Sequence, residues 1–130
     1  MRQIEIPDWL IEEVREEIRE EARTGLDDGE CRMYVCKEWT EGDAQVYLDG
    51  YLELQGVSRY EEQYDGCYDD ELQWVSVASD CLDIYACDAE SGEDIAVSIT
   101  NLKKIMDYRY EAYNGGNPLI YRQRKRKRTA

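Results

Sequence analysis

Two side chains are missing from this 130-residue sequence, which contains no histidine and no phenylalanine. Histidine is the side chain that ordinarily exchanges protons near neutral pH, so its absence excludes histidine-based acid–base catalysis and histidine-activated nucleophiles. The sequence also lacks a G-x-S-x-G elbow and a P-loop. Carboxylates are abundant, but no pair stands out as a glycosidase-type acid and nucleophile. We expect no enzyme, no catalytic residue and no cofactor.

Long apolar runs are also missing. No stretch approaches the roughly 18 consecutive apolar residues of a membrane span. The opening residues MRQIEIPDW contain no apolar core of a signal peptide. The sequence therefore predicts a cytoplasmic protein with no membrane partner.

The cysteines are odd in number and lack metal-binding spacing. There are five, and none forms a C-x-x-C pair. Without histidine to complete a zinc site, we expect buried, reduced thiols that act as small apolar residues and bind no metal. These residues are Cys31, Cys36, Cys67, Cys81 and Cys87.

Charge is distributed unevenly along the chain, whose net charge is −14. Residues 1–100 contain 7 Lys and Arg against 28 Asp and Glu, a net charge of −21. Residues 101–130 contain 9 against 2, a net charge of +7. We expect one acidic domain over residues 1–121 and a disordered basic tail over residues 122–130. Such asymmetry bears on partners rather than on fold.

The central element of the predicted fold is the stretch Asp43–Gly56, DAQVYLDGYLELQG. Its even-numbered positions are apolar or small, and its odd-numbered positions, Tyr47 and Tyr51 among them, are polar or amphipathic. This alternation predicts one long strand with one face in the core. The Asp-Gly pair at Gly50 is also a hairpin signal, but a turn there would mix Glu53 with the apolar set. We favour the uninterrupted strand, with Gly50 as a bulge or a point of close packing.

Two helices flank the predicted strands. The first opens at Ile6-Pro7-Asp8 and ends at Gly25, and its apolar stripe recurs every three or four residues. The second covers residues 101–113, with Thr100 or Asn101 as its N-cap. The residues of the first stripe are Leu10, Ile11, Val14, Ile18 and Ala22, and those of the second are Leu102, Ile105, Met106, Tyr110 and Tyr113.

Three further segments have strand patterns. Residues 30–39 alternate and should pair with the central strand. Residues 72–88 are extended with a kink at Ser79-Asp80, and residues 95–99 alternate cleanly, so we expect a hairpin between 82–87 and 94–99. The order α-β-β-β-β-α predicts an α+β fold, a four-stranded antiparallel sheet with an N-terminal and a C-terminal helix packed on one face.

Residues 57–70, VSRYEEQYDGCYDD, are the least regular part of the acidic body. Tyrosine at every fourth position would suit a helical turn. The acids in this segment do not have calcium-loop spacing. We expect a mobile, solvated acidic loop rather than a metal site.

The first of three functional hypotheses is a protein-interaction module, and in its sharpest form an inhibitor whose carboxylates imitate nucleic-acid phosphates on a basic partner surface. Such binding would weaken with salt. A solvated acidic surface with no partner explains the same residues equally well. The candidate partner-binding residues are Glu12, Glu13, Glu16, Glu20, Glu61, Glu62, Asp65, Asp69 and Asp70.

The second hypothesis is nucleic-acid binding through the C-terminal end, where basic and tyrosine side chains interleave. The acidic body would repel the same phosphates. The tail could equally fold over the protein's own acids or serve as a nuclear address. The candidate residues are Lys103, Lys104, Arg109, Tyr121, Arg122, Arg124, Lys125, Arg126, Lys127 and Arg128.

The third hypothesis is self-association. A sheet edge must be left exposed, and the solvent face of the central strand carries Tyr47 and Tyr51. A homodimer through either surface would need no further signal in the sequence.

Overall fold

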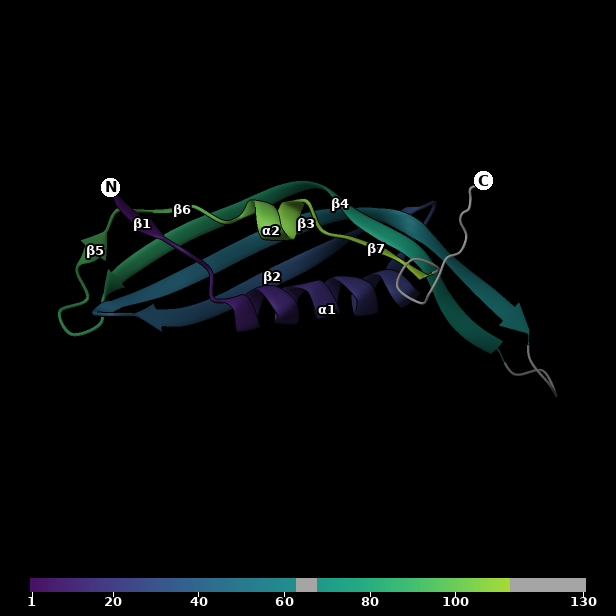
Figure 1. Cartoon of the computed structure of the whole chain (residues 1–130), viewed down its shortest axis with the longest axis horizontal. Helices are drawn as coiled ribbons and strands as arrows, with labels where there is room; N and C mark the ends of the chain where they lie inside the picture. The colour runs from purple at the N-terminus through teal and green to yellow at the C-terminus, as the bar shows by residue number, and fades with distance from the viewer. Residues whose placement is uncertain (63–67, 113–130) are drawn as a thin grey trace.

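A long antiparallel sheet runs the length of the molecule in the computed structural model, which describes residues 1–62 and 68–112 (Figure 1). Two helices lie on one of its faces, so the predicted α+β class is confirmed. The sheet consists of β2 (Glu30–Glu41), β3 (Ala44–Glu62), β4 (Tyr68–Asp88) and β5 (Asp94–Ile95), with β7 (Arg109–Glu111) also paired to β4.

Helix α1 (Asp8–Gly25) has the predicted ends and the predicted buried stripe. Its five stripe residues are all at most 2% exposed. The amides of Leu10 and Ile11 both donate to the Pro7 carbonyl, which satisfies two donors of the first turn. A helix with one narrow apolar stripe covers a sheet rather than entering its core, and α1 lies across the inner faces of β2, β3 and β4.

Strand β3 is continuous through Gly50, as predicted. It pairs with β2 from Ala44 to Gln55 and with β4 along its whole length. Gly50 has φ +146°, and a Cβ built on it would lie 2.0 Å from the Cys81 carbonyl oxygen. Gly50 is therefore a point of close packing between β3 and β4.

Residues 57–62 and 68–70 differ from the expected irregular loop, and residues 63–67 of that prediction lie outside the described residues. Residues up to 62 continue β3, and residues from 68 begin β4, in register with each other. Two register shifts, opposite Glu53/Leu54 and Val57/Ser58, interrupt the pairing. The first shift inserts one extra residue in β4 next to Ser79-Asp80, where the sequence predicted a kink. An extra residue of this kind bends a strand.

The second helix is much shorter than predicted. Helix α2 covers only Lys103–Met106, with Leu102 rather than Thr100 or Asn101 at its N-cap. Residues 109–111 form β7, which pairs with Trp74–Ser76 of β4. The helical spacing of the apolar residues is overruled here because the edge of β4 offers unpaired backbone groups to this segment.

A parallel pair joins the two ends of the described chain. Strand β1 (Arg2–Ile4), which the sequence did not predict, pairs with β6 (Val97–Ile99). Only residues 94–95 form the predicted hairpin with β4, so residues 95–99 are split between two sheets. The nearly buried Asn101 accepts a hydrogen bond from the Ile6 amide at 2.8 Å and donates one to the Ile6 carbonyl at 3.0 Å.

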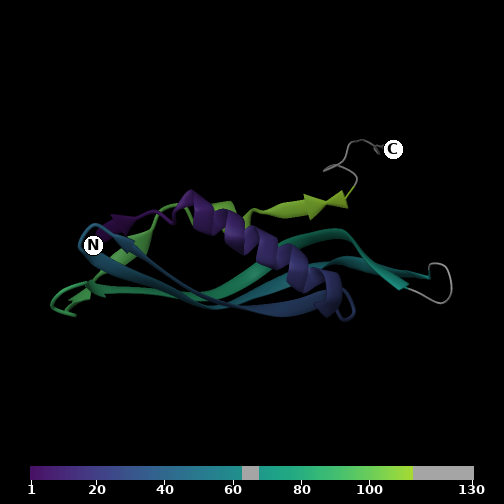
Figure 2. The same ribbon diagram turned by 90° about the horizontal axis from the view of Figure 1, so that it is seen from below.

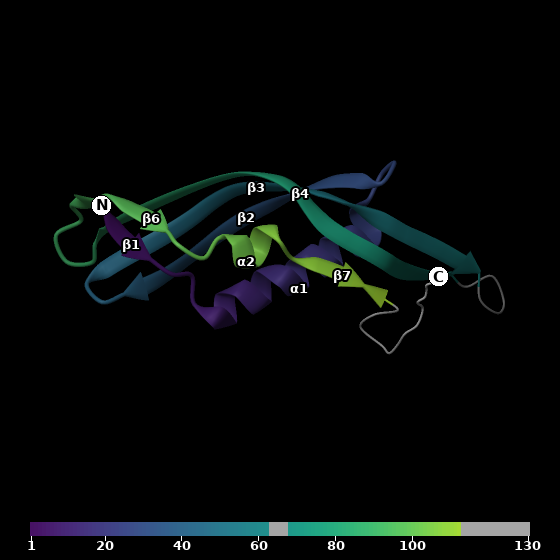
Figure 3. The same ribbon diagram turned by 45° about the horizontal axis from the view of Figure 1, so that its top comes forward.

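The core lies between the sheet and the covering elements. β1, β6, α2 and β7 follow one another beside α1 on the same side of the sheet (Figure 3). The side chains of Val46, Leu48 and Leu52 on β3 and Ile105 on α2 are at most 2% exposed. No described helix is long and apolar enough to cross a membrane.

Candidate interaction surface

The candidate acids on α1 are largely paired with bases of the same protein. Glu12 binds Arg15 at 2.9 Å, and Glu20 binds Arg23 at 3.1 Å, each pair three residues apart on the helix. Arg19, three residues after Glu16, instead donates to the Tyr108 hydroxyl at 2.6 Å, and this hydrogen bond raises the pKa of Arg19. The helix surface therefore carries fewer unpaired carboxylates than the count of its acids indicates.

Lys37 of β2 reaches α1 and lies 2.6 Å from Glu13 and 2.5 Å from Glu17. Burial lowers the pKa of Lys37, but its hydrogen bonds to these two carboxylates outweigh burial, and the pKa is raised. These pairs tie the edge strand to the helix and neutralise Glu13, another candidate partner-binding residue. Of the four helix candidates, only Glu16 has no ion pair within the described ranges.

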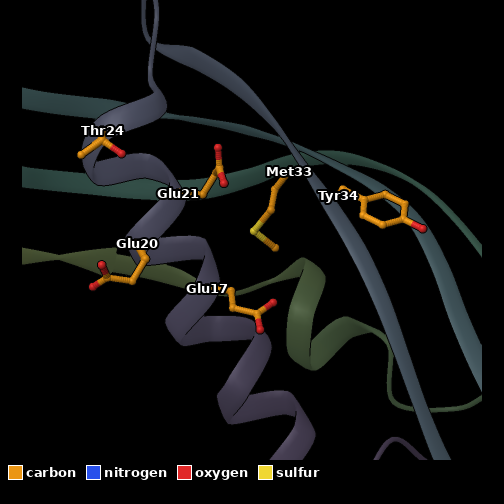
Figure 4. A pocket seen from close by; sticks show the side chains of 6 residues that line it. All are labelled: Glu17, Glu20, Glu21, Thr24, Met33 and Tyr34. Atoms are coloured by element: carbon orange, nitrogen blue, oxygen red, sulfur yellow. The ribbon is translucent and has the colours of Figure 1, made fainter.

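An open hollow of about 330 Å³ lies beside these pairs, where α1 meets β2 (Figure 4). Met33 points from β2 toward the helix, whereas Tyr34 points away to the other face of the sheet. The residues that line the hollow are Glu17, Glu20, Glu21, Thr24, Met33 and Tyr34. Three carboxylates over an apolar floor form an acidic surface with no further feature that indicates a ligand.

The remaining candidate acids lie on an extension of the β3–β4 hairpin. The Ser58 hydroxyl donates to the Arg23 carbonyl at 2.8 Å at the end of α1, and both strands continue past that point (Figure 1). Glu61 is in register with Asp69, and Asp70 and Glu62 lie in adjacent pairs. Asp65 lies outside the described residues.

The candidate nucleic-acid residues do not form a basic patch within residues 1–62 and 68–112. Lys103 pairs with Asp107 at 4.0 Å, and Lys104 lies 3.7 Å from Asp8. Arg109 stacks 4.4 Å from the Trp74 ring centroid and binds Glu111 at 2.8 Å. Tyr121 and the basic residues of the tail lie outside the described residues.

The face of the sheet opposite the helices carries no described element (Figure 2). We call it the open face. It carries the alternate side chains of β2, β3 and β4, which the register aligns in rows across the three strands. Its central rows contain Tyr34, Tyr51 and Cys81; Cys36, Asp49 and Asp83; and Glu38, Tyr47 and Tyr85.

Tyrosine rings dominate two of these rows. Tyr34 and Tyr51 contact each other with centroids 5.4 Å apart, and Tyr47 and Tyr85 stack at 5.0 Å with an interplanar angle of 15°. Tyr34 is 56% exposed, Tyr51 43% and Tyr85 54%. Large aromatic side chains on an uncovered sheet face form a patch of the kind that marks interaction sites.

The row between the tyrosines is acidic. Asp49 and Asp83 are directly opposed on β3 and β4, and like charges in that relation are destabilising. A hydrogen bond with Asp49 raises the pKa of Tyr34, and Cys36 and partial burial contribute to the same shift. The Asp49 oxygen Oδ1 is buried with no hydrogen-bond partner in the described part of the chain.

Four of the cysteines lie in the described residues, and all four are free. The expectation that they are buried is wrong for Cys36 and Cys81, which are exposed on the open face, while Cys31 and Cys87 are half-buried. Strand alternation decides this, because Cys36 and Cys81 have the same orientation as the tyrosines. Burial raises the pKa of the Cys31 thiol, and Glu21 and Glu53 add to the shift. No group of three or more metal-ligating side chains is assembled in residues 1–62 and 68–112.

The sequence prediction identified Tyr47 and Tyr51 as a solvent-facing pair but missed the rest of the open face. The alternation of residues 30–39 places Tyr34 and Cys36 on the open face, so their position could be predicted from the sequence pattern. The pairing of Tyr47 with Tyr85, and of Asp49 with Asp83, depends on the β3–β4 register, which no local signal fixes. Comparisons with protein-family models, with curated proteins and with solved structures give no match.

Proposed function

We propose that the chain is a non-enzymatic protein-interaction module that binds a basic partner protein through the open face. The observation that carries the proposal is the exposure of Tyr34, Tyr51 and Tyr85, 43–56% each, on three hydrogen-bonded strands that no described element covers. Tyrosine gives a large apolar contact area and a polar tip, and it is enriched in protein interfaces.

The charge of the body supports a basic partner. Residues 1–100 have a net charge of −21, and the open face itself carries Glu38, Asp49 and Asp83. Such a field accelerates association with a positive surface and repels anionic ones. The pairing of the α1 acids with Arg15, Arg23 and Lys37 moves the proposed contact from the helix to the open face.

A nucleic-acid-binding surface is one basic partner that fits this proposal, and the chain would then act as an inhibitor by phosphate mimicry. The β3–β4 extension, with Glu61 and Asp69 in register, adds acidic residues at one end of the sheet. This form of the proposal predicts that DNA or RNA competes with the chain for the partner.

Affinity capture with the full chain tests the proposal, with partner identity and salt dependence as the readouts. The wild type is compared with a double variant of the open face, Tyr51→Ser and Tyr85→Ser, and with a helix control, Glu12→Gln and Glu16→Gln. We expect a basic protein that is retained at low salt, released at high salt, kept by the helix control and lost by the open-face variant.

Equal capture of the same protein by all three forms would contradict the open face as the contact. No basic protein retained at low salt would contradict the proposal as a whole. Light scattering over a concentration series addresses self-association. A wild-type dimer that the open-face variant loses would show that the face binds a second copy instead.

A further inference from the structure

The middle of the open face combines aromatic rings and carboxylates around a small hollow. The hollow has a volume of about 340 Å³, at the lower end of the range for small-ligand sites. Tyr47, Tyr85, Glu38, Asp49 and Cys36 line it from the open face, and Lys37 and Leu48, whose side chains lie on the helix side, complete the lining.

The chain already holds one of its own guanidinium groups on this face. Arg32 lies 5.3 Å from the Tyr51 ring centroid and binds the Glu53 carboxylate at 2.6 Å. A ring and a carboxylate on adjacent positions therefore accommodate an arginine here. The hollow repeats this combination two rows away with Tyr47, Tyr85 and the acids.

Among residues 1–62 and 68–112, no basic side chain pairs with the acids of the repeated arrangement. Neither Asp49 nor Asp83 has an ion pair within the described residues, although the two are opposed in register. Asp49 Oδ1 is buried and has no hydrogen-bond partner among the described residues. Asp83 is exposed and available without movement. A bound cation would relieve the repulsion in this row.

The geometry favours arginine over lysine as that cation. The rings of Tyr47 and Tyr85 are stacked, with their centroids 5.0 Å apart. Such rings present a flat aromatic surface, on which a planar guanidinium can stack. The guanidinium fork also matches carboxylate geometry, whereas an ammonium is a strongly hydrated point charge.

We infer that the hollow lined by Tyr47, Tyr85 and Asp49, together with Asp83, which is in register with Asp49, binds an arginine side chain presented by the basic partner protein. The inference rests on the proposed function, because it names the partner chemistry that the open face recognises. The negative charge of the body and the acids of this row supply the charge complementarity.

Two synthetic peptides of equal length and charge, one arginine-rich and one lysine-rich, test the inference by titration against the full chain. We expect the arginine peptide to bind about tenfold more tightly than the lysine peptide. Tyr85→Ala and Asp83→Asn should each reduce this preference about tenfold, because they remove the ring and the carboxylate that recognise the guanidinium. Both residues are exposed, so neither substitution should impair folding. Glu16→Gln removes the same charge from α1 and should leave the preference unchanged.

The outcomes separate the inference from the proposed function. Equal binding of the two peptides, with Asp83→Asn behaving like Glu16→Gln, would overturn the arginine site and leave a basic partner in place. No binding of either peptide by the wild type, or by a variant ending at residue 121, would overturn both. Binding only by the shortened variant would show that the chain's own basic residues 122–128 compete for the face, and would overturn occupation by a partner.

Discussion

Gly50 is the residue on which the closest approach of β3 and β4 depends, so its substitution by alanine should be costly. Its φ is +146°, a backbone conformation that residues with a Cβ rarely adopt. A Cβ at this position would lie 2.0 Å from the Cys81 carbonyl oxygen and 2.9 Å from the Leu82 Cα. Both neighbours are backbone atoms, so no side-chain rotation relieves the clash.

The expected loss of stability has two sources, the unfavourable φ at position 50 and the clash of a Cβ with the backbone of β4. A residue forced into a sparsely populated backbone region costs about 1–3 kcal/mol, and moving β4 away from β3 weakens pairs on either side. We therefore expect Gly50→Ala to lose about 3–4 kcal/mol of unfolding free energy, which for a domain of this size lowers Tm by roughly 10–15 °C.

Gly92 supplies the matched control. It also has a positive φ, +76°, but a Cβ there would have nothing within 4 Å. Gly92→Ala should therefore cost only the conformational term, about 1–2 kcal/mol. Urea unfolding of the full chain, followed by circular dichroism, measures both variants. Equal losses for the two would refute the reasoning, because the close approach would then contribute nothing.

Three further predictions concern single side chains. Asn101→Ala should cost about 2–3 kcal/mol in urea unfolding, because it leaves both backbone groups of Ile6 without their partner, and a loss near zero would contradict this. Two backbone amides of the following loop lower the pKa of Asp88 below its ordinary 3.8, so wild type should be more stable than Asp88→Asn at neutral pH and lose that advantage as pH falls through the lowered pKa. The hydrogen bond with Asp49 raises the pKa of Tyr34, so it stabilises the fold at pH values below the ordinary pKa of 10.0 and loses this effect as pH rises through the raised value. Ultraviolet titration should show one tyrosine ionising at lower pH in Asp49→Asn than in wild type.

The elements with strong periodicity were predictable from sequence because each buries one face. The stripe of α1 and the alternation of β3 are local patterns, and burial in the folded chain follows them residue by residue. The prediction of a helix over residues 101–113 was wrong for the opposite reason. The apolar spacing of this segment suits a helix, but pairing of residues 109–111 with the edge of β4 is a tertiary effect that no window of sequence contains.

The candidate site divides in the same way. Strand parity alone is enough to place Tyr34, Tyr47 and Tyr51 on one face. The row that joins Tyr47 to Tyr85 is set by the β3–β4 register and by the bulges that interrupt it, and these depend on packing along the whole hairpin. The interpretation of the α1 acids as a partner-binding surface was incomplete for a different reason. Composition counts the acids and the bases but does not show which carboxylates the bases pair with.

The absence of phenylalanine has a physical meaning on the open face. A sheet with helices on one side only must present its other side to solvent, and a phenylalanine-rich face there would favour irreversible association. Tyrosine retains most of the aromatic contact area while its hydroxyl remains hydrated or, as in Tyr34, bound to a carboxylate. Tyr34, Tyr47, Tyr51 and Tyr85 therefore suit a face that no described element covers. Under the proposed function, the intervening acids would make that face repel its own copy at low salt and attract a basic partner, which is the electrostatic behaviour that a reversible, partner-selective contact requires.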